Sequence, residues 1–367
     1  MKHKWPVAHI SLVTLGIAAL VAAVLLLACG DDDVCEEGYT DCDGECVDLS
    51  VDNDEHCGRC HNACGGAADG CVDSVCRWYV YATSADGTAR KLDFEGEEVW
   101  TYDGHSDWVR SVAVDTEGFV YTASRDGTVH KLDSDANKIW SFDGHDDELR
   151  QVAVDPSGYV YTSSVDQTVR QLTPEGEEIW VYDGHDGTVW GLAVDSDGYT
   201  YTGSQDETVR KIDPDGENVW TFEDGDGLVR DVAVDSEGYV YSVSNDETAR
   251  KIDSDGNEVW TFDDHDDAIW DVAVDRDGYV YTASADQTAR KLDADGEEQL
   301  RYEGHTDLTR TIAATTEGEV YTASYDATVK KFDADAEELW TFDGFNRGMR
   351  SITVGSGDYG AFPDNWK

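Results

Sequence analysis

Short runs of alternating apolar and polar residues follow one another along the chain from residue 78, and their order repeats every 40 residues. One unit contains four such runs, at residues 109–115, 118–124, 128–133 and 138–142. Clusters of Gly, Asp, Asn and Arg separate the runs. Alternation of this kind between turn-forming residues predicts β-strands, so we expect an all-β structure over this region.

Four short strands per unit at a period near 40 residues predict the blades of a β-propeller. First strands recur around residues 110, 150, 190, 230, 270, 310 and 350, which gives seven blades. The chain enters the repeat at Trp78, on a second strand, and residues 348–354 supply the missing first strand. We therefore expect a seven-bladed propeller at 78–355 that is closed by its C-terminal strand, which leaves no open edge. Residues 356–367 would follow it as a tail.

Several residues recur once per unit, such as His105, Ser124 and Asp126. A tryptophan lies in the fourth strand of six units, at Trp100, Trp140, Trp180, Trp220, Trp260 and Trp340. The His, Ser and Asp motifs resemble WD40 repeats, although the third-strand Trp of that family is Leu, Ile or Phe here. The fourth-strand Trp resembles that of quinoprotein-like (PQQ-like) propellers. Because these residues repeat with the blades, we interpret the tryptophans as inter-blade packing and the histidines as hydrogen-bond partners.

One position just inside the first strand carries unusual side chains. It is occupied by Arg110, Arg150, Trp190, Arg230, Trp270, Arg310 and Arg350. The WD40 resemblance implies that this position faces the channel mouth on the top face and contacts partners. Two hypotheses follow. Each Arg could pair with an Asp of the repeat and hold the propeller together, or the arginines could bind an anionic ligand that stacks on Trp190 and Trp270.

Three further positions of the repeat are notable for their side chains. Two of them vary freely on the same face, as Trp108 and Arg125 illustrate. The third, on the third strand, is basic in every unit, and its members are Arg90, His130, Arg170, Arg210, Arg250, Arg290 and Lys330. We interpret this third-strand series as a solvated stripe that offsets neighbouring acids.

The N-terminal segment has the order of an export signal. A short basic stretch precedes an apolar run that ends in Leu-Leu-Ala-Cys29. This run resembles the lipobox of bacterial lipoproteins, which implies a signal peptide at 1–28, lipid attachment at Cys29 and an acidic tether at 29–34. In that family an Asp after the cysteine tends to retain the protein at the inner membrane, so the resemblance and Gly30 together imply an outer-membrane or cell-surface location, with a periplasm-facing one as the alternative. The alternative is an uncleaved membrane helix, which would also place the rest of the chain outside the cytoplasmic membrane.

Residues 35–77 contain eight cysteines, Cys35, Cys42, Cys46, Cys57, Cys60, Cys64, Cys71 and Cys76. An even number in a small, apolar-poor exported segment predicts a disulfide-rich module, whose pairing stays open. The segment resembles cysteine-rich modules in exported proteins of myxobacteria. Cys57-Gly-Arg-Cys60-His61 also matches the pattern for haem attachment. Few large apolar residues are present to enclose a haem, and an oxidising compartment disfavours zinc, so we expect no cofactor and no metal.

The charge of the chain changes the picture in two ways. With 27 Lys and Arg against 79 Asp and Glu, the formal net charge is −52, which excludes a nucleic-acid partner. An acid-rich surface with few lysines is also typical of proteins from high salt, so we expect a halophilic protein.

Two classes of function remain. The sequence lacks a Gly-x-Ser-x-Gly, a His-Glu-x-x-His and a phosphate-binding loop, and blades without insertions leave little room to build an enzymatic site. We therefore expect a non-enzymatic, monomeric, membrane-anchored lipoprotein whose propeller binds a protein or an anionic glycan or peptide at its top face. The alternatives are a quinoprotein-like enzyme and a propeller similar to the lipoprotein that helps assemble outer-membrane proteins.

Overall fold

The structure, a computed structural model, describes residues 40–42, 45–47, 68–72, 75–225, 227–315 and 318–355. The chain divides into two compact units, residues 1–48 and 49–367. In the first unit, β1 (Thr40–Cys42) and β2 (Glu45–Val47) form an antiparallel hairpin. Every regular element among the described residues is a β-strand, which confirms the all-β prediction.

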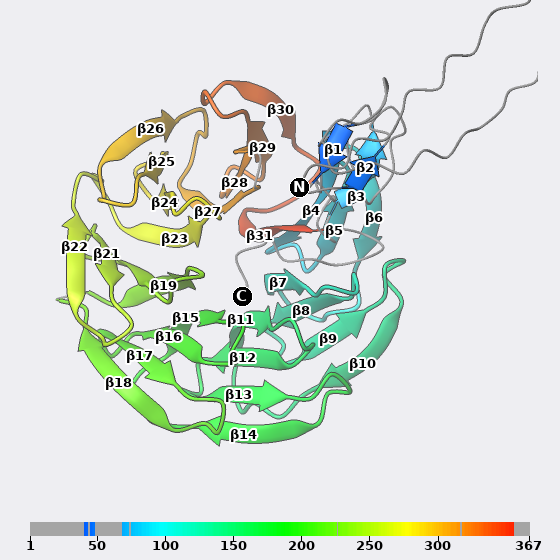
Figure 1. The fold of residues 1–367 in the computed structure, drawn as a ribbon. Coiled ribbons are helices and arrows are strands. Elements are labelled where there is room, and N and C mark those ends of the chain that lie inside the picture. The colour runs from blue at the N-terminus through cyan, green and yellow to red at the C-terminus, as the bar shows by residue number, and fades with distance from the viewer. Residues whose placement is uncertain are drawn as a thin grey trace, which may run out of the picture. The chain divides into compact units, whose positions relative to one another are not determined.

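The second unit contains seven antiparallel sheets arranged as the blades of a propeller, with four strands in each blade; β3 (Ala68–Val72) pairs in addition with β4 (Val75–Ser84) of blade 1 (Figure 1). Blade 1 contains β31 (Met349–Gly355), β4 (Val75–Ser84), β5 (Ala89–Leu92) and β6 (Glu98–Tyr102); blade 2 contains β7 (Val109–Val114), β8 (Val120–Ser124), β9 (Val129–Leu132) and β10 (Lys138–Phe142); blade 3 contains β11 (Leu149–Val154), β12 (Val160–Ser164), β13 (Val169–Leu172) and β14 (Glu178–Tyr182); blade 4 contains β15 (Val189–Val194), β16 (Thr200–Ser204), β17 (Thr208–Ile212) and β18 (Asn218–Glu223).

The remaining blades repeat this order. Blade 5 contains β19 (Val229–Val234), β20 (Val240–Ser244), β21 (Ala249–Ile252) and β22 (Glu258–Phe262); blade 6 contains β23 (Ile269–Val274), β24 (Val280–Ser284), β25 (Ala289–Leu292) and β26 (Glu298–Tyr302); blade 7 contains β27 (Thr309–Ala314), β28 (Val320–Ser324), β29 (Val329–Phe332) and β30 (Glu338–Phe342). The first strand of each blade lies innermost, around the central channel, and the fourth strand lies at the rim (Figure 1).

The two ends of the repeat meet in blade 1, as the sequence predicts. The C-terminal strand β31 pairs antiparallel with β4, with Ile352 opposite Ala82. β31 also contacts β27 of blade 7 and β7 of blade 2, so it completes the ring of inner strands. β4 begins at Val75, and its first residues pair with β3 (Ala68–Val72). The strand that enters the propeller therefore starts three residues before Trp78.

The core consists of apolar layers between neighbouring blades. The second strands are buried along their whole length from blade 2 to blade 7, because blades cover both of their faces. Between blades 2 and 3, for example, Tyr121 and Ala123 pack with Val152 and Val154 of the next inner strand. Strands covered on both faces are rich in Val and aromatic residues, because both sets of alternating side chains need apolar neighbours.

The fourth-strand tryptophans join six of the seven blades to the next one, and Leu300 takes their place in blade 6. Trp100 Nε1 donates a hydrogen bond of 3.0 Å to the carbonyl of Ser134, in the outer turn of blade 2. The other five repeat this contact, and Trp340 closes the series by donating to the carbonyl of Phe94 in blade 1. Trp340 also covers Gly96, where a Cβ would lie 3.0 Å from the indole. The predicted inter-blade packing is therefore confirmed.

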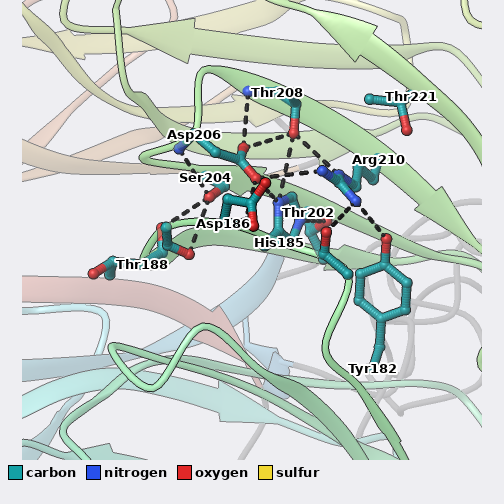
Figure 2. A network of polar contacts seen from close by, with 12 residues as sticks. Tyr182, His185, Asp186, Thr188, Thr202, Ser204, Asp206, Thr208, Arg210 and Thr221 are labelled. Carbon is teal, nitrogen blue, oxygen red and sulfur yellow. Dashed lines mark hydrogen bonds and ion pairs between the residues drawn. The ribbon is translucent and has the colours of Figure 1, made fainter.

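The repeated histidines fix the loops that lead from one blade to the next (Figure 2). His185 Nδ1 donates to Asp206 at 2.8 Å, and its Nε2 lies within hydrogen-bond distance of the hydroxyl of Thr202, at 2.8 Å. Among the described residues no hydrogen bond joins Ser204 to His185; Ser204 Oγ instead accepts from the backbone N–H of Asp206. Burial favours the neutral form of the Asp206 carboxyl, but the hydrogen bonds from His185 and Thr208 outweigh it and hold its pKa far below the usual range.

Candidate functional site

The seven Arg and Trp residues that the sequence singled out, which we call the mouth ring, share one backbone feature. In blade 2 the register between β7 and β8 shifts between Val109 and Ser111, so Arg110 occupies a β-bulge. The other six blades carry the same shift at the equivalent residue. A bulge leaves one residue unpaired and redirects its side chain. Each blade therefore turns one Arg or Trp away from the sheet toward the channel.

The ring side chains contact one another around the mouth. The guanidinium carbons of Arg150 and Arg230 lie 3.9 and 4.7 Å from the ring centroid of Trp190. Arg230 and Arg310 lie 3.8 and 4.9 Å from the centroid of Trp270. Each indole thus lies between two guanidinium groups and makes a cation–π contact with both. Because each indole already contacts two guanidiniums, a ligand at this mouth would meet the arginines before the tryptophan faces.

Residues at the two variable positions of this face join the ring. Trp108 packs against Arg110 and Arg350, at 5.1 and 4.4 Å from its centroid. Arg230 Nε donates to the Asn245 side-chain oxygen at 2.6 Å, and Arg350 donates to the hydroxyl of Tyr325. The sequence marked these positions as variable without showing that they support the ring.

The mouth ring has few acidic partners. Glu148 accepts from Arg110 Nη2 at 3.2 Å and from Arg125 Nε at 2.6 Å, and it lies 3.9 Å from Arg150. Among the described residues, Arg230, Arg310 and Arg350 form no ion pair with a carboxylate. The hypothesis that each ring arginine pairs with an Asp of the repeat is therefore wrong. Among the described residues Glu148 is the one carboxylate that forms ion pairs with the ring, and it comes from a variable position.

Burial and mutual repulsion oppose the charges of the ring. Burial, followed by the charges of Arg150 and Arg350, lowers the pKa of Arg110 to about 10. Burial, followed by the charge of Arg310, lowers the pKa of Arg230 to about 10. Both groups remain charged at neutral pH. A nearby anion would relieve this unfavourable concentration of positive charge.

Six of the seven ring side chains also bury a nitrogen that has no hydrogen-bond partner among the described residues. These atoms are the Nε of Arg110, Arg150, Arg310 and Arg350 and the Nε1 of Trp190 and Trp270. Buried donors are normally satisfied, because leaving one unpaired costs about 1–3 kcal/mol. Buried donors of this kind take an ordered water or a bound ligand as their acceptor.

A second layer of side chains, which we call the floor ring, follows one residue along each inner strand. Its members are Ser111, Gln151, Gly191, Asp231, Asp271, Thr311 and Ser351. Four of them accept a hydrogen bond from a backbone N–H of the next blade, as Asp271 accepts from Ile312 at 2.7 Å. Burial and the neighbouring Asp271 carboxyl raise the pKa of Asp231 well above its usual value. Burial beside a second carboxyl therefore favours the neutral form of Asp231.

A small cavity of about 20 Å³ lies between the two layers. It is lined by Arg110, Arg150, Trp190, Arg310 and Arg350 of the mouth ring and by Ser111, Gln151, Asp271 and Ser351 of the floor ring. A larger cavity of about 290 Å³ follows in the channel, where alanines and valines of the inner strands form most of the lining. Polar and charged side chains are thus concentrated at the mouth end of the channel.

The third-strand basic series is not the solvated stripe that the sequence suggested. Arg290 is 1% exposed and pairs with Asp286 at 3.3 Å and with Glu298 at 2.9 Å. Arg90, Arg170, Arg210, Arg250 and Lys330 also pair with acids of their own blades. His130, Arg290 and Lys330 are buried and the other members are half-buried. The acids of the repeat therefore pair with this series and not with the mouth ring.

His130 takes the arginine position of this series in blade 2. Its Nδ1 lies 2.8 Å from the hydroxyl of Tyr102, and its ring stacks on His105 at a centroid distance of 3.9 Å. Burial, followed by the charge of His105, lowers the pKa of His130 to about 4. In blade 4 Arg210 makes the equivalent contact, with Nη1 donating to Tyr182 at 3.0 Å.

We expect this histidine to make the protein sensitive to acid. The pKa of His130 is about 4 in the folded state, below the unfolded value of 6.5. Neutral His130 therefore contributes to the free energy of unfolding in full above pH 6.5, and this contribution is lost as the pH falls toward 4. The loss would be about 2–3 kcal/mol. Denaturation midpoints at pH 7 and pH 4.5 should therefore differ less in His130→Arg than in the original protein. An identical pH dependence of the two proteins would contradict this assignment.

The predicted N-terminal features lie largely outside the described residues. This applies to the signal peptide, to Cys29 and to Cys35, Cys57, Cys60 and Cys64. Cys42, Cys46, Cys71 and Cys76 lie on described strands, and the β3–β4 register places Cys71 opposite Cys76, but the disulfide pairing stays a prediction. No helix able to cross a membrane occurs among the described residues. In the same part of the chain, no group of three or more His, Cys, Asp or Glu side chains could hold a metal ion.

Comparison with known families finds three matches, all within the blades. Residues 165–269 match the family of the outer membrane protein assembly factor BamB. Residues 79–186 match the lambda-carrageenase beta-propeller domain. Residues 256–291 match the WD domain, G-beta repeat. No curated protein matches the chain.

Proposed function

We propose that this WD40-like and PQQ-like propeller is a non-enzymatic binding platform whose ligand is anionic and binds at the mouth ring. The observation that carries the proposal is the unpaired charge of the ring. Its five arginines have Glu148 as their one carboxylate ion-pair partner among the described residues, and four of them bury an unpartnered Nε. In a chain with a net charge of −52, such a cluster would concentrate anions at one place.

The regularity of the blades supports a binding role over an enzymatic one. The paired His and Asp groups recur in blade after blade, as His145 with Asp166 and His265 with Asp286 illustrate. A catalytic site needs one special arrangement of acid, base and nucleophile. Asp231 and Asp271 are a special pair, but their oxygens are bonded to backbone and side-chain groups of the inner strands.

The N-terminal sequence supports an exported protein anchored in a membrane. The lipobox-like Leu-Leu-Ala-Cys29 would attach a lipid, and the acidic tether and the cysteine module would hold the propeller away from the surface. We place the protein at the outer membrane or the cell surface, as a monomer. The second candidate function is assembly of outer-membrane proteins, which the match of residues 165–269 favours.

A binding screen with anionic polymers tests the proposed function. Purified full-length protein would be offered sulfated and carboxylated polysaccharides and acidic peptides, with carrageenan first because of the carrageenase match. We expect binding that weakens with salt and falls at least about tenfold in Arg150→Ala/Arg230→Ala. Arg301→Ala is the matched control, since Arg301 lies on β26 and pairs with Glu298. No binding of any anionic polymer, or equal binding by both variants, would contradict the proposal.

A further inference from the structure

The four arginines around the small cavity come from adjacent blades. Arg310, Arg350, Arg110 and Arg150 belong to blades 7, 1, 2 and 3, and all four line the cavity. Each has a buried Nε without a partner, and Arg350 as a whole is 9% exposed. The four arginine side chains therefore reach the cavity from four adjacent blades, along half of the ring.

The balance of charge at this point is positive. The five ring arginines have Glu148 as their one carboxylate ion-pair partner among the described residues, and Glu148 also pairs with Arg125, so positive charge is in excess. Asp271 lines the cavity, but its Oδ2 accepts from Thr311 Oγ1 at 2.8 Å and from the N–H of Ile312 at 2.7 Å. Ser111 and Ser351 add hydroxyl groups to the lining.

We propose that the mouth ring binds a tetrahedral oxyanion, a sulfate or phosphate group, with one oxygen in the cavity between Arg110, Arg150, Arg310 and Arg350. This inference deepens the proposed function, because it names the chemical group of the ligand. A planar carboxylate can satisfy one or two guanidinium forks. A tetrahedral oxyanion presents oxygens in several directions, so it matches donors that converge from four blades. The cavity of about 20 Å³ has room for one oxygen-sized atom, and the rest of the group would lie among the guanidiniums above it.

The group could be a free ion or an ester on a larger molecule. Sulfate and phosphate would be titrated into full-length protein by calorimetry at constant ionic strength, with acetate as the planar anion and a sulfated polysaccharide as the ester. We expect one sulfate or phosphate per chain and binding of acetate at least about tenfold weaker. A polysaccharide that competes with sulfate identifies an ester as a ligand, whereas sulfate binding without competition identifies the free ion. Absence of saturable sulfate and phosphate binding, or equal affinity for acetate, would overturn the inference.

Variants locate the site. Arg110→Gln/Arg350→Gln should weaken sulfate binding about a hundredfold, and Arg301→Gln should leave it unchanged. Removing ring charges relieves repulsion, so the double variant should unfold at the same or a higher temperature than the original protein without sulfate. Sulfate binding that survives in the double variant would overturn the inference. Polymer binding that survives in this variant while sulfate binding is lost would overturn the ester ligand and leave the proposed function intact. Sulfate binding without any polymer or peptide binding would overturn the proposed function and leave the oxyanion site intact.

Discussion

A chain that ends after Gly348 is expected not to fold, because it lacks the strand that closes the propeller. β31 pairs with β4 over six residue pairs and buries Met349 and Ile352 between blades. Its loss removes about 2 kcal/mol for each apolar side chain and about 1 kcal/mol for each strand hydrogen bond. The sum, about 10 kcal/mol, is comparable with the whole stability of a typical domain. We expect no cooperative unfolding transition in circular dichroism.

The matched control is a chain that ends after Gly355, which keeps β31 and removes the predicted tail. It should unfold cooperatively, with a midpoint near that of the full chain. If the chain that ends after Gly348 unfolds with the same midpoint as this control, closure by β31 contributes nothing and the assignment is wrong.

Replacing Gly191 with alanine is expected to destabilise the protein by about 3 kcal/mol or more. Gly191 is the floor-ring residue of blade 4, and a Cβ there would lie 2.7 Å from Asp231 Cα and 2.9 Å from Val232 N. Both are backbone atoms of β19 in blade 5, so relief of the clash requires the two inner strands to separate. The midpoint of urea denaturation measures the loss.

Ser351→Ala is the control for this substitution, because it changes the same position in blade 1, where a Cβ is already present. We expect a change within about 1 kcal/mol for the lost hydroxyl. Equal midpoints for Gly191→Ala and the original protein would show that blades 4 and 5 can accommodate a Cβ at this position, which would contradict the close packing of the two inner strands.

The propeller could be predicted from sequence because its information is local and repeated. Alternation, turn residues and a constant period of 40 residues appear in every unit, so one interpreted unit predicts the others. Closure by β31 also followed, because the first unit lacks a strand and the last supplies one. The repeat does not predict the polar contacts of blade 5, because Gly225 replaces the repeated histidine there. Arg250 contacts Asp224 and Asp246 in that blade.

The candidate site could be predicted only in its composition. The Arg and Trp residues stand out in the sequence, but their orientation depends on a β-bulge, which leaves no mark in the hydrophobic pattern. Their partners were also beyond sequence reasoning. Glu148 and Trp108 are far in sequence from most of the ring arginines, and the acids of the repeat, which were plausible partners, pair instead with the third-strand basic series.

The most direct test of the account is the location of a heavy oxyanion in crystals of the protein. Selenate has the shape and charge of sulfate, and its selenium atom can be located by anomalous scattering. The account predicts one strong selenium site at the mouth ring, within hydrogen-bond distance of Arg110 and Arg350. Crystals that bind selenate elsewhere and leave the mouth ring without it would contradict the claim that these arginines form an anion site.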